Sequence, residues 1–228
     1  MVGIVNNINN LACNHFGDKE KADIRGERTT KPAVSSGVAL VLGSAEGVWQ
    51  EIAAAQAMHR FDAVIAVNDM VIFWTGPLDA AVSLHPERMP EWLEYRAARR
   101  NSPPVKLVTH AEWPDWFKVV GHIHELPIPF DIVTPSMFEG QKDSGSSGLF
   151  AVKAALQDLG FAKVVLCGVP MTVEAGHFRS PSLPWVGALR HRVGWEQALP
   201  HLTDCVRSMS GWTAELLGKP TKSWLDTA

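Results

Sequence analysis

Short apolar runs alternate with glycine-containing turns and amphipathic stretches along most of the chain. The runs have the length and unbroken hydrophobicity of parallel strands buried on both faces. They occupy residues 38–42, 61–67, 79–84, 105–108 and 164–167. Between several of them, apolar residues recur three and four positions apart, as in helices that cover a sheet. The alternation predicts an α/β fold, a single Rossmann-like domain with a mostly parallel sheet flanked by helices.

The segment 143–171 shows this alternation most completely. It begins with the small-residue turn Gly145-Ser146-Ser147-Gly148, continues as an amphipathic helix that Gly160 is placed to end, and closes with an apolar strand. Free backbone N–H groups at a helix N-terminus attract anions, so the turn is a candidate phosphate site. A turn that needs small residues only for steric reasons is the alternative.

Two further candidates follow the first two strands. The first strand leads through the sequence GSAEG, residues 43–47, into a helix pattern that ends at Met58. This strand–turn–helix order opens a doubly wound fold, although the turn lacks the full GxGxxG pattern. The second strand ends at Asn68, where a polar side chain faces the crevice that such sheets use for ligands. A loop or capping role for Asn68 is the alternative.

The remaining elements are less regular. A helix that Pro86 opens carries Arg96, Arg99 and Arg100 at its end, where we expect them to be solvated. The proline-interrupted segment 113–138 is expected to form edge strands or a lid. The pattern then predicts a helix over 185–199, a strand over 201–208 and a helix over 211–217.

The domain boundary is predicted from the loss of periodicity near the N-terminus. Residues 1–36 mix asparagine, charged and small residues without a period, which predicts a flexible N-terminal arm. Residues 37–228 are predicted to form one Rossmann-like α/β domain, because no internal repeat or linker divides them.

Composition excludes several classes of partner. The net charge of −3 and the lack of Lys/Arg clusters argue against nucleic acid. No apolar run approaches the ~20 residues of a membrane span, and no secretory signal is visible. The three cysteines, Cys13, Cys167 and Cys205, lack metal-type spacing, so we expect reduced thiols and a cytoplasmic protein.

The candidate chemistry favours group transfer from a nucleotide-linked donor. The chain has neither a GxSxG nucleophile motif nor a P-loop lysine. His122 and His124 could chelate a metal ion, but no HExxH or Asp-rich partner accompanies them, so no metal site is predicted. What remains is glycine-rich turns for phosphate, polar strand ends for a ribose or base, and histidines for a proton.

Four short stretches resemble one family. They are Val41-Leu42-Gly43-Ser44-Ala45-Glu46, Ile65-Ala66-Val67-Asn68, Gly145-Ser146-Ser147-Gly148 and Leu166-Cys167-Gly168-Val169-Pro170. Together they resemble the bacterial sialyltransferases that use CMP-sialic acid. The chain also looks like their relatives, the motility accessory factors and the related domain of archaeal hydroxymethylpterin diphosphokinases. The resemblance extends over roughly residues 37–218.

The resemblance implies particular roles. The donor nucleotide would contact Gly43, Ser44 and Asn68, and the donor phosphate would lie against Ser146, Ser147 and Gly148. The base that deprotonates the acceptor would be His191 or His177. The chain departs from the family at GSAEG, which replaces the usual Gly-Asn-Gly-Pro-Ser type of loop and places the Glu46 carboxylate near the expected phosphate.

The resulting functional prediction is a glycosyltransferase with a CMP-sialic-acid-like donor. Transfer to a glycan or small-molecule acceptor would be metal-independent, would need no cofactor and would use a histidine base, and Arg179, Arg190 or Arg192 could offset charge on the leaving phosphate. Two alternatives stay open. One is a pterin-type diphosphokinase that uses ATP and Mg²⁺, and the other is a non-catalytic nucleotide-binding or structural module.

Overall fold

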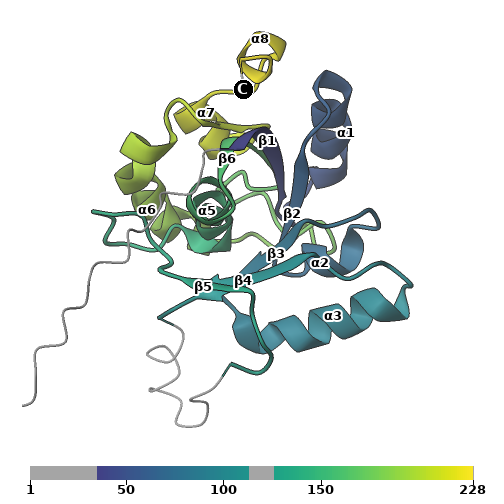
Figure 1. The fold of residues 1–228 in the computed structure, drawn as a ribbon. Helices are drawn as coiled ribbons and strands as arrows, with labels where there is room; N and C mark the ends of the chain where they lie inside the picture. Colours follow the sequence, from purple (N-terminus) through teal and green to yellow (C-terminus); the bar gives the residue numbers. More distant parts are fainter. Residues whose placement is uncertain (1–34, 113–125, 228) are drawn as a thin grey trace, which may run out of the picture. The chain divides into compact units, whose positions relative to one another are not determined.

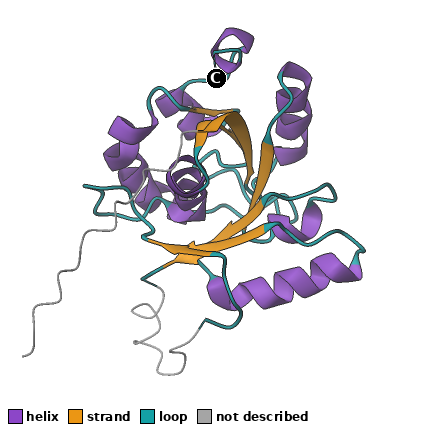
Figure 2. Cartoon of the chain, in the orientation of Figure 1, coloured by secondary structure: helices purple, strands orange, loops and turns teal. Residues whose placement is uncertain are grey.

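Seven parallel strands form one sheet in the computed structural model, which describes residues 35–112 and 126–227 (Figures 1 and 2). The strand order is β5-β4-β3-β2-β1-β6-β7. The strands are β1 (Ser35–Leu42), β2 (Ala63–Val67), β3 (Ala80–Ser83), β4 (Lys106–His110), β5 (Ile132–Thr134), β6 (Phe161–Cys167) and β7 (Val206–Ser208). The expected α/β, Rossmann-like fold is confirmed.

The strand order reverses at β1. From β1 the chain builds outward through β2 to β5, and β6 then pairs with the other edge of β1. Val41, for example, lies opposite Ile65 of β2 on one side and opposite Leu166 of β6 on the other. Connections that leave β1 and β6 therefore go to opposite faces, which opens a crevice at their carboxyl ends. Sheets of this type bind their ligands at such a switch point.

Each face of the sheet has its own helical layer and core. One layer contains α1 (Val48–Met58), α2 (Met70–Phe73), the 3₁₀ turn η1 (Pro86–Arg88), α3 (Met89–Ala98) and α8 (Lys222–Leu225). The other contains α5 (Ser146–Lys153), its π-helical continuation η2 (Ala154–Asp158), α6 (Gly187–Leu202) and α7 (Gly211–Leu217). Figure 1 shows α5, α6 and α7 together on one side of the strands and α1, α2 and α3 on the other.

The alternation of side chains along β1 explains both cores. Leu40 and Leu42 belong to the core under α1, α2 and α3, while Ala39 and Val41 belong to the core under α5, α6 and α7. All four side chains are fully buried. A central strand with helices on both faces needs apolar residues at every position, so the unbroken apolar run is the signal by which the sequence predicts it.

Most expected boundaries are close to the observed ones. Gly160 has φ 80° and follows the end of η2, as predicted. The last strand is shorter than predicted, because α6 continues to Leu202 and buries this residue and Ala198 in the core one turn apart. The sequence pattern did not predict α8.

The expectation of a solvated arginine cluster is wrong for Arg96. Its side chain is fully buried and donates hydrogen bonds to four backbone carbonyl oxygens. They belong to Val71 (2.9 Å), Trp74 (2.6 Å), Gly76 (2.8 Å) and Ser102 (2.5 Å). Desolvation lowers the pKa of the Arg96 guanidinium, which nevertheless stays charged. Arg96 therefore fastens the end of α2 to α3.

Several expectations fall at or beyond the borders of the described residues. The predicted arm, 1–36, lies outside them except for Ser35 and Ser36, which already belong to β1. Residues 113–125, with His122 and His124, are likewise outside, whereas the edge strand expected in 113–138 is confirmed by β5. No helix in the two described ranges is long and apolar enough to cross a membrane.

Candidate functional site

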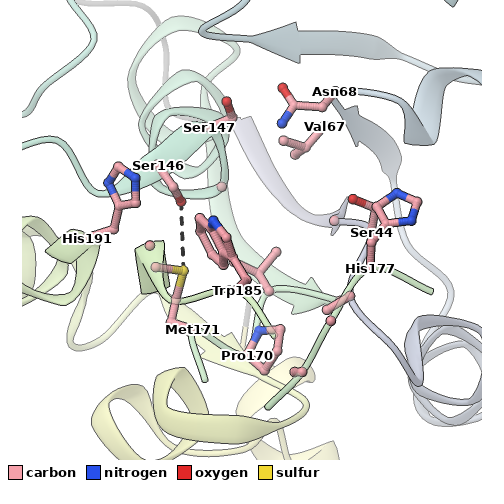
Figure 3. Close-up of a pocket in the computed structure, with 18 of the residues that line it drawn as sticks. Ser44, Val67, Asn68, Ser146, Ser147, Pro170, Met171, His177, Trp185 and His191 are labelled. Atoms are coloured by element: carbon pink, nitrogen blue, oxygen red, sulfur yellow. Dashed lines mark hydrogen bonds between the residues drawn. The ribbon is translucent and has the colours of Figure 1, made fainter. Parts of the chain in front are cut away.

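A cavity of about 770 Å³ opens at the carboxyl ends of β1, β2, β3 and β6, where the strand order reverses (Figure 3). The loops after these strands, the N-terminus of α5 and the beginning of α6 line it. All the residues expected to bind the donor or to act as the base line this cavity: Gly43, Ser44, Asn68, Ser146, Ser147, Gly148, His177 and His191. Residues that are up to 148 positions apart in the sequence (191 − 43) thus meet in one place.

Backbone strain is concentrated at this cavity. Within the described ranges, four non-glycine residues have a positive φ, and three of them line the cavity: Asn68 (53°), Ser146 (80°) and Met171 (51°). A side chain in this left-handed region costs energy that the surrounding structure must supply. Strained positions tend to cluster at functional sites, so this distribution marks the cavity rather than the surrounding scaffold.

Asn68 presents its amide nitrogen to the cavity. Its Oδ1 accepts a hydrogen bond from the Ser83 hydroxyl at 2.7 Å, and the Ser83 oxygen in turn accepts from the His85 backbone N–H at 2.8 Å. The oxygen of the Asn68 amide is thereby held toward β3. The Nδ2 group makes no hydrogen bond to another described residue and is left with two N–H donors for a ligand.

The N-terminus of α5 offers backbone donors. The Ser146 N–H is 3.4 Å from the Ser144 hydroxyl oxygen, whereas the amides of Ser147 and Gly148 make no hydrogen bond within the described part of the chain. First-turn amides have no intrahelical partner. A Cβ on Gly148 would lie 2.7 Å from the Val169 side chain, so this helix can approach β6 only with glycine there. The two amides and the helix dipole favour an anion in the cavity.

The loop after β1 contributes shape, and two of its amides are already bonded to the end of β6. The Gly43 N–H donates to Cys167 O at 2.8 Å and the Ala45 N–H donates to Gly168 O at 3.1 Å. A Cβ on Gly43 would lie 2.3 Å from Gly168 O, so the ends of β1 and β6 require glycine to come this close. Glu46 is exposed and does not line the cavity, so its carboxylate stays away from a bound anion.

His191 has the arrangement of a general base. Its Nδ1 lies 2.9 Å from Ser144 O, and because a carbonyl oxygen can only accept, Nδ1 carries the proton. The lone pair is then on Nε2, on a ring that lines the cavity. Trp185 stacks on this ring with centroids 5.7 Å apart. His191 is thus oriented by a carbonyl on one side and by an indole on its face.

His177 is engaged at both ring nitrogens. Nδ1 accepts the Arg179 backbone N–H at 3.1 Å, so the ring proton is on Nε2, which donates to Asp69 Oδ2 at 2.8 Å. The neighbouring Phe178 N–H donates to Ser44 O at 2.9 Å. These contacts tie the loop 172–184 to the ends of β1 and β2. His177 lines the cavity but has no lone pair left for a proton transfer.

The charge of the lining favours an anionic ligand. None of the described residues that line the cavity is a carboxylate, and Arg190 is a lining cation. Arg179 and Arg192 lie elsewhere: the Arg192 Nε–H donates to Met171 O at 2.9 Å and its guanidinium lies over the Trp212 ring. An anion therefore meets the helix N-terminus and Arg190 without repulsion from an acidic side chain.

The described residues contain neither a reactive thiol at Cys167 nor a cluster of metal-ligating side chains. Cys167 is fully buried, and burial raises the pKa of its thiol far above the usual value, so it stays protonated. No group of three or more His, Cys, Asp or Glu side chains in the two described ranges could hold a metal ion. Asp69 binds His177, and Asp143 accepts from Gln197 at 2.8 Å; neither lines the cavity.

Two contributors were not expected from the sequence. Trp185 orients His191, and the Met171 sulfur accepts from the Ser146 hydroxyl at 3.8 Å (Figure 3). Met171 is apolar and lies four residues after the end of β6, so the rule that singled out the polar Asn68 directly after β2 did not find it. No local signal distinguishes Trp185 from the other eight tryptophans.

No protein-family model, no curated protein and no solved structure matches the chain. The fold and the side chains of the cavity are therefore the features that bear on function.

Proposed function

We propose that the protein is a glycosyltransferase that binds a CMP-sialic-acid-like nucleotide-sugar in this cavity. One observation carries the proposal: the unbonded amides of Ser147 and Gly148 and the oriented imidazole of His191 line the same carboxylate-free cavity. An anion site next to a base with a free lone pair suits the transfer of a group from a phosphate leaving group to a hydroxyl.

The donor fits the cavity in size and in hydrogen-bonding capacity. Ligand pockets commonly measure about 300–1,000 Å³, and this one lies within that range. The phosphate is placed at the N-terminus of α5, and the Asn68 Nδ2 group donates to the ribose or base. In Figure 3, His191 and Ser146 lie on one side of the cavity, and Ser44 and His177 lie on the other. The sugar carbon that reacts is therefore placed on the His191 side.

In the proposed reaction, the acceptor oxygen bonds to the anomeric carbon of the sugar while the bond from that carbon to the phosphate oxygen breaks. His191 Nε2 takes the hydroxyl proton, and the nucleotide leaves as its phosphate anion with the bonding electron pair. The amides of α5 and the guanidinium of Arg190 stabilise the charge that collects on this phosphate. His177 serves to position the loop, because both of its ring nitrogens are occupied.

The test is a thermal-shift panel of CMP, CDP, UDP, GDP and ATP, each with and without Mg²⁺. A ligand at about a hundred times its dissociation constant stabilises the fold by ~2.7 kcal/mol. We expect CMP to raise the melting temperature without Mg²⁺. Ser146→Asp should abolish the shift, since it puts a carboxylate at the N-terminus of α5. Ser146→Asn is the matched control, because Asn has the same size and also tolerates a positive φ.

The same panel distinguishes the alternatives. A shift only with ATP and Mg²⁺ would replace the proposal by a pterin-type diphosphokinase, and a flat panel would leave a non-catalytic module. A CMP shift that is equal in Ser146→Asp and Ser146→Asn would place the nucleotide elsewhere on the protein.

A further inference from the structure

A second hollow of about 330 Å³ lies beside the cavity, between α2, α3 and the loop 172–184. We name it the arginine cleft, after Arg88, Arg99 and Arg179, which line it. The hydrogen bond from His177 to Asp69 separates the two hollows, since Asp69 lines the cleft and His177 lines the cavity. Nothing in the proposed transfer reaction uses this cleft.

The charges of the cleft do not balance. Glu91 forms an ion pair with Arg88 at 3.1 Å, whereas Asp69 accepts a hydrogen bond from the neutral His177 ring at 2.8 Å and keeps its negative charge. No ion pair with a described residue engages the guanidinium of Arg99 or of Arg179. The charges of Arg99 and Arg179, which come from segments 80 residues apart (179 − 99), therefore exceed that of the Asp69 carboxylate and leave the hollow positive.

Both guanidinium groups rest on one aromatic ring. The central carbons of Arg99 and Arg179 lie 5.1 Å and 5.0 Å from the centroid of the Phe73 ring. Phe178 packs edge-on against Phe73 at 5.1 Å, which fixes this ring in place. Stacking orients a guanidinium but leaves its N–H donors free and its charge unneutralised. The N–H donors and the charge of both arginines therefore remain available to an anion in the cleft.

We propose that the arginine cleft is a second anion-binding site, which takes a phosphate or carboxylate group through Arg99 and Arg179. The planar donor fork of arginine matches both groups in a bidentate manner. Tyr95 also lines the cleft, and its phenol supplies a further donor. A bound anion holds Arg179, two residues from His177, and so fastens the loop 172–184 that forms one wall of the cavity.

The experiment titrates inorganic phosphate into the full chain that carries Ser146→Asp, so that the N-terminus of α5 is closed to anions. Melting temperature is the readout, and sodium chloride at equal ionic strength corrects for screening. We expect a saturable stabilisation by phosphate. Arg99→Gln and Arg179→Gln should each weaken phosphate binding by about tenfold or more. Arg88→Gln is the matched control, because this arginine lines the same cleft but is already paired, and it should change binding by less than about twofold.

Succinate in place of phosphate distinguishes the two ligand chemistries, and the tighter ligand assigns the class. The proposal is overturned if sodium chloride stabilises as well as phosphate does, or if Arg88→Gln weakens binding as much as Arg179→Gln. Loss of phosphate binding with Ser146→Asp alone would also overturn it, and would assign the anion to the cavity instead. Unchanged circular dichroism of each variant excludes misfolding as the cause.

Discussion

The two histidines expected to act as the base differ in whether a ring nitrogen is free to accept a proton. In His191, the Nδ1–H donates to the Ser144 carbonyl oxygen, which leaves the Nε2 lone pair free on a ring that lines the cavity. In His177, a backbone N–H occupies Nδ1 and the Asp69 carboxylate occupies Nε2. A base needs a lone pair within reach of the proton that it removes. At the scale of single residues, the hydrogen-bond partners thus favour His191.

His191→Asn is expected to lower the transfer rate by about 10²–10⁴-fold, the usual contribution of a positioned general base. The asparagine Nδ2 group can still donate to Ser144 O, so nucleotide affinity should change little. Release of CMP from CMP-sialic acid, together with the thermal shift produced by CMP, measures both effects.

The comparison variant for this experiment is His177→Gln. Because His177 ties the loop to Asp69, its replacement should lower the melting temperature and have only a small effect on the transfer rate. A larger loss of rate in His177→Gln than in His191→Asn would reverse the assignment of the base.

At the scale of elements, buried polar contacts hold the segments that surround the site. Arg96 joins α3 to the end of α2, directly after the stretch that carries Asn68 and Asp69. Glu51 of α1 accepts from the Gly168 N–H at 2.7 Å and from the Ser210 hydroxyl at 2.5 Å, and so fixes the exit of β6. The Glu51 carboxylate and the Arg96 guanidinium therefore have a structural role.

Arg96→Met should reduce the free energy of unfolding by about 3 kcal/mol or more, because it leaves four carbonyl groups without their donor. This corresponds to a fall in melting temperature of roughly 6–12 °C for a chain of this size. Urea denaturation followed by circular dichroism provides the measurement.

Arg99→Met serves as the control on the same helix end. Arg99 is exposed and lies over Phe73, so the loss should stay within about 1 kcal/mol. Equal destabilisation by the two variants would contradict the role given to Arg96.

At the scale of the whole molecule, a buried histidine makes stability depend on pH. His110, at the end of β4, is 1% exposed and its Nε2 lies 3.1 Å from Leu84 O. Desolvation lowers its pKa below the ordinary value; Glu112 opposes this effect, and the charge of His85 adds to it. The unfolded chain therefore binds a proton at a higher pH than the folded chain does. The free energy of unfolding must fall as the pH drops through about 6.5.

His110→Gln should flatten this dependence, since glutamine does not titrate and keeps a donor for Leu84 O. We expect the wild type to lose more stability than the variant between about pH 8 and about pH 5. Denaturation curves at a series of pH values give both slopes. Parallel slopes would mean that His110 accepts no proton on unfolding.

Periodicity and local turn chemistry were sufficient for the fold class and for the positions of the candidate residues. An unbroken apolar run reports burial on both faces, and polar residues at the end of such a run report the edge where parallel sheets bind ligands. For this reason Asn68 could be named from the sequence, and Ser146 and Ser147 could be named because a Gly/Ser turn precedes a helix pattern. Both signals are local, since they depend on residues within a few positions of each other.

The strand order and the hydrogen-bond partners depend on contacts between distant segments. The resemblance implies that Gly43 contacts the donor nucleotide, but its N–H donates to the distant Cys167 carbonyl. The helix pattern suggests a solvated Arg96, but its guanidinium is buried and donates to four carbonyls, three of them 20 or more positions away. His177 and His191 are equivalent as residue types, and only their partners, 108 and 47 positions away, separate their roles. A pattern of neighbouring residues carries no information about such pairs, because they form only when the sheet brings its segments together.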